Sequence, residues 1–217
     1  MIAYVGQTRA AALVAELQAA GVGECTQRGE LGPRRSPWFY DCGAFKDHTA
    51  GRPLFDGVRW LRDLWRIRDW PEIDPPAFVV VPDQVAAGDA SLAFSREWRD
   101  HVRETLPGVP AYLVVQDGMA PDVVRGALQA GEFDGLFVGG TLEWKLETGA
   151  EWVALAHDCG RPCHVGRVGT VDRVRWAREI GADSIDSCLP LWSRRKLGAF
   201  LDVYHGRDRR MTRRVDR

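Results

Sequence analysis

Short apolar runs recur along the chain, and most are followed by a stretch in which apolar residues have helical spacing. Eight runs have the length and composition of buried strands. They are residues 2–5, 22–27, 38–40, 78–81, 112–115, 135–138, 164–168 and 184–185. Continuous apolar strands that alternate with helices are typical of a parallel sheet covered by helices.

The intervening stretches predict helices at residues 8–20, 56–69, 92–106, 121–130, 142–158, 171–180 and 193–204. Too few residues separate Gln27 from Trp38 for a full helix. Eight repeats favour closure into a barrel. We therefore predict a compact (β/α)8 barrel of the TIM type with an abbreviated second βα unit. A doubly wound open sheet is the alternative. The barrel domain would span residues 1–205, followed by a basic tail at 206–217.

Composition adds the class of protein. The chain is 45% apolar and 27% charged, which is ordinary for a soluble globular protein. No apolar run approaches the roughly 20 residues of a membrane span, and no signal peptide is evident. Five scattered cysteines favour a reducing compartment, so we predict a cytoplasmic protein that does not bind membranes.

Charge is unevenly distributed. The net charge is −1, yet residues 194–217 hold nine Lys or Arg against three Asp. Such a basic end is typical of a nucleic-acid-binding segment. A simple solvated terminus is the alternative.

Polar residues gather where the predicted strands end. Asp41, Asp83, Gln116, the pair Gly139-Gly140, and Asp186 each follow a different apolar run. In a barrel the carboxyl ends of all strands meet on one face, which is where such enzymes carry their sites. A single Asp there could be a helix N-cap. Several polar groups converging on one face favour an active site instead.

Several carboxylates without an obvious His, Lys or metal set favour glycosyl chemistry. One carboxylate can attack an anomeric carbon while another moves a proton to and from the leaving group. Asp and Gln side chains can also bind the polar edge of a base, and glycines allow the backbone to approach it closely.

In their order along the chain, these segments resemble the queuine and archaeosine tRNA-guanine transglycosylases and their DNA-modifying relatives. The family's DSGGFQ segment is similar to residues 41–46, and its VQG segment to residues 115–118. Its Gly-Gly turn, its MGVGTP segment and its FDCVLPTR segment are similar to residues 139–140, 165–170 and 185–190. The resemblance covers about residues 38–196.

The resemblance implies a β/α barrel that exchanges guanine for a 7-deazaguanine base (of the preQ0 type) without a cofactor or catalytic metal. It implies that Asp186 is the nucleophile and Asp41 the general acid/base. It also implies a base-binding group made of Asp83, Gln116, Gly139, Gly140 and Phe45.

The chain departs from the tRNA enzymes in two respects. No Cys follows Cys188, so the zinc site that they build from three Cys and a His is missing. The Pro-Thr-Arg segment reads Pro190-Leu191-Trp192, which leaves Arg194, Arg195 and Lys196 to bind the nucleic-acid backbone. In these two respects the chain is more similar to the compact DNA-modifying members of the family, including those of bacteriophages. We therefore predict DNA as the polymer. A phage-encoded member would act in the host cytoplasm, and tRNA is the alternative substrate.

Other interpretations stay open at this level. The same carboxylates would suit a base-releasing hydrolase. A non-catalytic partner subunit is a second alternative. A barrel enzyme that binds phosphate through residues 139–140 and 166–169 is a third. The segment with His157, Cys159, Cys163 and His164 could hold a metal. Cys42 has no evident activating His and is expected to be a small packing residue. A homodimer and a complex with partner proteins are both compatible with the sequence.

Overall fold

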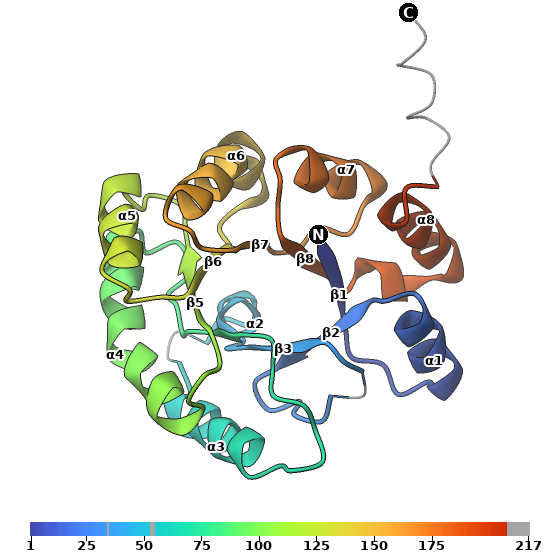
Figure 1. Ribbon diagram of the computed structural model, residues 1–217, viewed down its shortest axis with the longest axis horizontal. Helices are drawn as coiled ribbons and strands as arrows, with labels where there is room; N and C mark the ends of the chain where they lie inside the picture. Colours follow the sequence, from blue (N-terminus) through green and yellow to red (C-terminus); the bar gives the residue numbers. More distant parts are fainter. Residues whose placement is uncertain (34, 53–54, 208–217) are drawn as a thin grey trace, which may run out of the picture.

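The described residues of the computed structural model, 1–33, 35–52 and 55–207, form eight parallel strands that close into a barrel (Figure 1). The strands are β1 (Ile2–Gly6), β2 (Gly23–Gln27), β3 (Trp38–Asp41), β4 (Val79–Val80), β5 (Ala111–Val115), β6 (Gly135–Val138), β7 (Cys163–Val165) and β8 (Ser184–Ser187). Each strand pairs with the next, and β8 pairs with β1 from Ile2↔Ser184 to Val5↔Ser187. The predicted TIM-type barrel is confirmed.

In the described part of the chain, seven helices form the ring outside the barrel (Figure 1). They are α1 (Ala11–Ala19), α3 (Gly57–Arg68), α4 (Asp89–Thr105), α5 (Pro121–Gln129), α6 (Leu142–Asp158), α7 (Val171–Glu179) and α8 (Arg194–Tyr204). The sequence pattern did not predict α2 (Ala44–Thr49) or the 3₁₀ turn η1 (Leu189–Trp192). Both are too short to show a helical period. They directly follow β3 and β8, and α2 lies inside the ring.

The second βα unit is abbreviated, as predicted, because no helix occurs between β2 and β3 in the part of the chain that the structure describes. The ring has a corresponding gap between α1 and α3 (Figure 1). The buried guanidinium of Arg35 lies in this connection. It donates to the carbonyl oxygens of Val5 at 3.3 Å and Gly23 at 3.1 Å, and pairs with Glu24 at 2.9 Å. Arg35, through its ion pair and its hydrogen bonds, thus covers β1 and β2 where a helix would otherwise cover them.

An aromatic layer fills the barrel and sets the depth of the site. Phe39 stacks on Phe78 with ring centroids 4.6 Å apart, and Phe137 stacks on His164 at 4.5 Å. Side chains two residues apart on a strand point to the same face. Asp41 therefore lies one layer above Phe39, and the glycines at 139 and 166 lie above Phe137 and His164. Because these glycines have no side chain, they leave space above the aromatic rings.

Element boundaries differ from prediction where the site begins. Strand β7 ends at Val165 rather than at residue 168, because Arg167 has a left-handed backbone with φ of 61°. Strand β8 continues to Ser187, so Asp186 lies within the strand instead of after it. No helix among the described residues is long and apolar enough to cross a membrane. Most of the predicted basic tail, residues 208–217, lies outside the described residues.

Candidate active site

A cavity of about 520 Å³ opens at the carboxyl ends of the strands. All seven residues that the sequence assigned to catalysis or base binding line it. They are Asp41, Phe45, Asp83, Gln116, Gly139, Gly140 and Asp186. They come from five different strand ends or the loops that follow them. The barrel therefore brings together residues that are up to 145 positions apart in the chain.

Asp186 is held by one of its two carboxylate oxygens. Its Oδ1 accepts a hydrogen bond from His164 Nε2 at 3.0 Å and one from the backbone N–H of Arg167 at 3.2 Å. No described residue donates to Oδ2. The side chain is 16% exposed, toward the cavity. One oxygen is thus fixed in place while the other is available to a ligand.

The imidazole of His164 orients this carboxylate. His164 is completely buried, and burial lowers the pKa of its ring, which favours the neutral form. A neutral imidazole has one N–H, and a carboxylate can only accept, so Nε2–H donates to Asp186. The other nitrogen, Nδ1, lies 2.8 Å from Ser184 Oγ and accepts from that hydroxyl. Ser184, His164 and Asp186 form a hydrogen-bonded chain across β7 and β8.

The two histidines of the candidate metal segment, His157 and His164, lie in different parts of the structure. His157 lies on the outer surface of α6 and contacts Asp183 Oδ2 at 2.9 Å, whereas His164 points into the barrel. Cys163 is buried on β7. Across residues 1–33, 35–52 and 55–207, no three His, Cys, Asp or Glu side chains are grouped to hold a metal ion. The proximity of these residues in sequence does not place them together in space.

Asp83 lies buried between two donors. Its Oδ1 accepts from Cys42 Sγ at 3.2 Å and its Oδ2 from Gln116 Nε2. Burial raises the pKa of Asp83 to about 7, and the charge of Asp41 adds to this effect, while the two hydrogen bonds oppose it. Cys42 is buried as predicted, but it also orients Asp83 as a thiol donor, because burial raises its own pKa. Gln116 Oε1 is buried and has no hydrogen-bond partner among the described residues.

Asp41 ends β3 at the wall of the cavity. Its Oδ1 accepts from the backbone N–H of Gly43 at 2.6 Å. Gly43 has a left-handed backbone with φ of 78°, which turns this N–H back toward the carboxylate. Burial raises the pKa of Asp41 to about 6 and the charge of Asp186 adds to the effect, while the Gly43 N–H and Arg28 oppose it. Asp41 can therefore hold a proton close to neutral pH.

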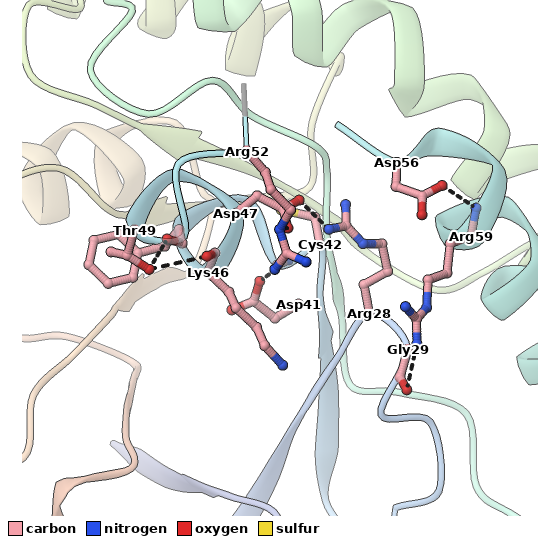
Figure 2. A network of polar contacts seen from close by, with 12 residues as sticks. Arg28, Gly29, Asp41, Cys42, Lys46, Asp47, Thr49, Arg52, Asp56 and Arg59 are labelled. Carbon is pink, nitrogen blue, oxygen red and sulfur yellow. Dashed lines mark hydrogen bonds and ion pairs between the residues drawn. The ribbon is translucent and has the colours of Figure 1, made fainter. Parts of the chain in front are cut away.

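Ion pairs fix the short helix α2, which carries Phe45. In Figure 2, Arg28 and Arg52 both approach Asp47 on α2, and Arg52 Nε lies 3.1 Å from Asp47 Oδ1. The Asp47 and Arg28 side chains are almost fully buried, so the pair is well shielded from solvent. This network holds α2 beside Asp41, and Phe45, 47% exposed, forms one side of the cavity.

Arg167 crosses the cavity from the β7–α7 loop. Its guanidinium donates to the carbonyl oxygen of Gly140 and lies over the Phe45 ring, 4.3 Å from the centroid. Below the loop, Lys145 is 2% exposed and donates to the carbonyl oxygen of Gly166. Burial lowers the pKa of Lys145 to about 7. These contacts hold the loop that supplies the backbone donor to Asp186.

None of the three predicted backbone-binding residues is among those that line the cavity. Arg194 pairs with Glu16 on α1, with Nη1 2.6 Å from Oε2. Lys196 Nζ lies 4.5 Å from the centroid of the Trp192 ring, and Arg195 is exposed. The cations that line the cavity are Arg167 and Arg173.

The sequence therefore missed four residues of the site: His164, Arg167, Lys145 and Arg173. Two of them had a usable signal. His164 is a polar residue at an inward position of an apolar strand, and Lys145 lies on an otherwise apolar face of α6. The contacts of Arg167 and Arg173 depend on loop conformation, which no local pattern encodes.

No protein-family model matches this chain, and no curated protein does.

Proposed function

We propose that this protein is a transglycosylase that replaces guanine in DNA with a 7-deazaguanine base through a covalent bond between Asp186 and C1′. One observation carries the proposal. Asp41, Asp83, Gln116 and Asp186 line a single cavity with an aromatic side chain at its edge, and their contacts differ in a way that suits different roles. The resemblance of the strand-end segments to the transglycosylases points to the same chemistry.

Base binding uses Asp83, Gln116 and Phe45. The guanine N–H groups at N1 and N2 would donate to the Asp83 carboxylate, and the unpartnered Gln116 Oε1 would accept a further N–H. A buried acceptor without a partner costs free energy, of the order of 1–3 kcal/mol, which a bound base would recover. Phe45 would stack on the base, with the Arg167 guanidinium displaced from its ring or sharing it.

In the first chemical step, Asp186 Oδ2 attacks C1′. The C1′–N9 bond breaks, its electron pair passes to guanine, and the proton held by Asp41 neutralises the departing base. His164 and the Arg167 N–H hold Oδ1, so the attacking oxygen keeps one direction. The target nucleotide must first leave the base stack, because C1′ of a stacked base cannot reach a cavity of this kind.

In the second step, the 7-deazaguanine occupies the same cavity. Its N9 attacks C1′, its N9 proton passes to the Asp41 carboxylate, and the bond between C1′ and Asp186 Oδ2 breaks. Two displacements retain the configuration at C1′. No electrons are transferred, so the exchange uses no redox cofactor.

We propose DNA as the polymer because Trp192 replaces the arginine of the tRNA enzymes in the segment after β8. The tRNA substrate is the alternative.

The test is an exchange assay on DNA and on tRNA that carry radiolabelled guanine, with and without an added 7-deazaguanine. We expect wild-type protein to release label from DNA only when the deazaguanine is present. Asp186→Asn, which keeps the side-chain shape, should release none. Asp122→Asn, an exposed Asp on α5 outside the cavity, is the matched control and should behave as wild type.

The other outcomes contradict specific parts of the proposal. Release without deazaguanine would indicate a base-releasing hydrolase. Release from tRNA but not DNA would show that the polymer is wrong. Equal release by wild type and Asp186→Asn would exclude Asp186 as the nucleophile, and no release from either polymer would favour a non-catalytic partner subunit.

A further inference from the structure

Trp192 is the most exposed aromatic residue that the structure describes, with 68% of its surface accessible. It ends η1, six residues after Asp186, and lines the same cavity. Tryptophan usually packs most of its area, so an indole left open at the rim of a site is suited to contact a partner. A planar ring beside a base-sized cavity fits another planar ring.

One cation contacts this indole and another lines the same cavity. Lys196 Nζ lies 4.5 Å from the ring centroid, and Arg173 lines the cavity without an ionic partner among residues 1–33, 35–52 and 55–207. Arg173 and Lys196 both lie in the first turn of a helix, α7 and α8 respectively. The positive end of the helix dipole opposes cations there, so helix stability does not account for their position. Arg194 differs, because it is neutralised by Glu16.

We propose that Trp192, Arg173 and Lys196 form a docking platform for the single-stranded DNA that flanks the extruded guanine. The neighbouring base stacks on the Trp192 indole, and the phosphates on either side pair with Lys196 and Arg173. Stacking on aromatic rings between cationic side chains is the general way in which proteins bind single strands. The choice of DNA rests on the proposed function. The platform itself rests on the exposed ring and the cations.

The position of the platform also explains how it would serve the site. Residues 188–192 connect it directly to β8, so a strand held on Trp192 is fixed relative to Asp186. Taking the target nucleotide out of the base stack costs free energy. Binding of the flanking nucleotide to the platform would offset part of that cost, which contacts in the cavity would otherwise have to offset alone. The platform sets where the strand enters and does not take part in bond breaking.

The experiment measures binding alone. Fluorescence anisotropy follows a labelled 12-nucleotide single-stranded DNA oligomer titrated with full-length protein, without any deazaguanine. We expect Trp192→Ala to weaken binding about 10- to 100-fold, since stacking on one ring typically contributes that much. Trp192→Phe should stay within about threefold of wild type. Trp65→Ala is the matched control, because Trp65 is also exposed, at 49%, but lies on α3 away from the cavity.

Salt titration tests the cations. For single strands, removing one phosphate contact lowers the slope of log K against log salt by about 0.7. Arg173→Gln and Lys196→Gln should each lower the slope by that amount, and Arg62→Gln, an exposed Arg on α3, should not change it. Thermal melting confirms that every variant is folded. If Trp192→Ala is unfolded, the platform is tested by the quenching of indole fluorescence when the oligomer binds. Trp192→Phe should lose a quenching signal that Trp65→Phe retains.

The platform fails if wild type does not bind the oligomer, or if Trp192→Ala binds as wild type does. An RNA oligomer of the same sequence that binds as tightly as DNA overturns the choice of DNA. These results are independent of the exchange assay. Weakened binding by Trp192→Ala without any exchange activity in wild type would support the platform and contradict the proposed function.

Discussion

At the residue scale, the asymmetry of the Asp186 carboxylate is the central feature. Two donors, His164 Nε2–H and the Arg167 N–H, contact Oδ1, whereas Oδ2 has no donor among the described residues, and Asp186 lines the cavity. A nucleophile held in this way loses little rotational freedom when it attacks, and preorganisation of this kind lowers the barrier. His164 is in turn held by Ser184 and by its stack on Phe137.

Replacing His164 tests this orientation. His164→Phe keeps an aromatic ring on Phe137 but removes both hydrogen bonds. A hydrogen bond to a charged group contributes about 1.5–3 kcal/mol, so we expect kcat to fall about 10- to 100-fold. Base affinity, measured by calorimetry, should stay within about twofold. Ser184→Ala should have a smaller effect on kcat, below about tenfold. A decrease in base affinity equal to the decrease in kcat would contradict a positioning role for His164.

The protonation of Asp83 gives a pH prediction. Burial raises its pKa to about 7, so the free protein holds a proton on Asp83 below that pH and releases it above. Only the ionised carboxylate accepts two N–H groups from guanine. Guanine affinity should therefore rise as the pH increases from 6 to 8, in calorimetric titrations. Asp83→Asn should bind weakly at every pH. An affinity that falls over this range would show that Asp83 binds the base in its protonated form.

At the element scale, the β7–α7 loop connects the parts of the site. The loop begins at Gly166. Glycine is required at this position because a Cβ there would lie 2.6 Å from the Phe137 ring. Lys145 holds the Gly166 carbonyl from below, and Arg167 reaches Gly140 and Phe45 above. The left-handed backbone of Arg167 directs its N–H at Asp186. Such a conformation is costly for a residue with a side chain, and it recurs at functional sites.

Two substitutions separate the backbone of Arg167 from its side chain. Glycine adopts a left-handed backbone without steric cost, whereas alanine does not. We expect Arg167→Gly to be about 1 kcal/mol more stable than Arg167→Ala in urea denaturation. Both variants lose the guanidinium, so their exchange rates should be reduced alike. If Arg167→Ala proves the more stable of the two, the left-handed conformation is not imposed by the fold.

At the scale of the whole molecule, the barrel makes the site by stacking layers. The aromatic layer closes the interior, and the next layer replaces large side chains with Gly139 and Gly166, so a cavity forms at the carboxyl ends of the strands. The ring of helices is interrupted after β2, where Arg35 supports the strands by hydrogen bonds. Neither the cavity nor the interruption prevents the eight strands from closing into a barrel.

A ligand that fills this cavity should stabilise the whole fold. At 100 times its Kd, a ligand adds about 2.7 kcal/mol, which for a chain of this length raises Tm by roughly 5–10 °C. We expect this shift in calorimetric melting with guanine and with a 7-deazaguanine, and none with cytosine. Gln116→Ala should abolish the shift, whereas Gln129→Ala, exposed at the end of α5, should retain it. An equal shift with cytosine would contradict recognition of the guanine edge.

Local periodicity in the sequence was sufficient to predict the barrel, its abbreviated second unit and the face that carries the cavity. Strand and helix periods are encoded by neighbouring residues, and parallel topology then places Asp41, Asp83, Gln116 and Asp186 on one face. Their assignment to catalysis and base binding stays a prediction. The short elements α2 and η1 escaped prediction because fewer than two helical turns show no detectable period.

Tertiary structure alone decided how these side chains meet. The contact between His164 and Asp186 joins residues 22 positions apart, and that between Cys42 and Asp83 joins residues 41 apart. Whether Trp192 is buried or exposed, and where the Arg167 guanidinium lies, depend on the packing of loops from different strands. Sequence patterns report which face a residue occupies. The direction of its hydrogen bonds follows only from the closed barrel, because the partners come from distant segments.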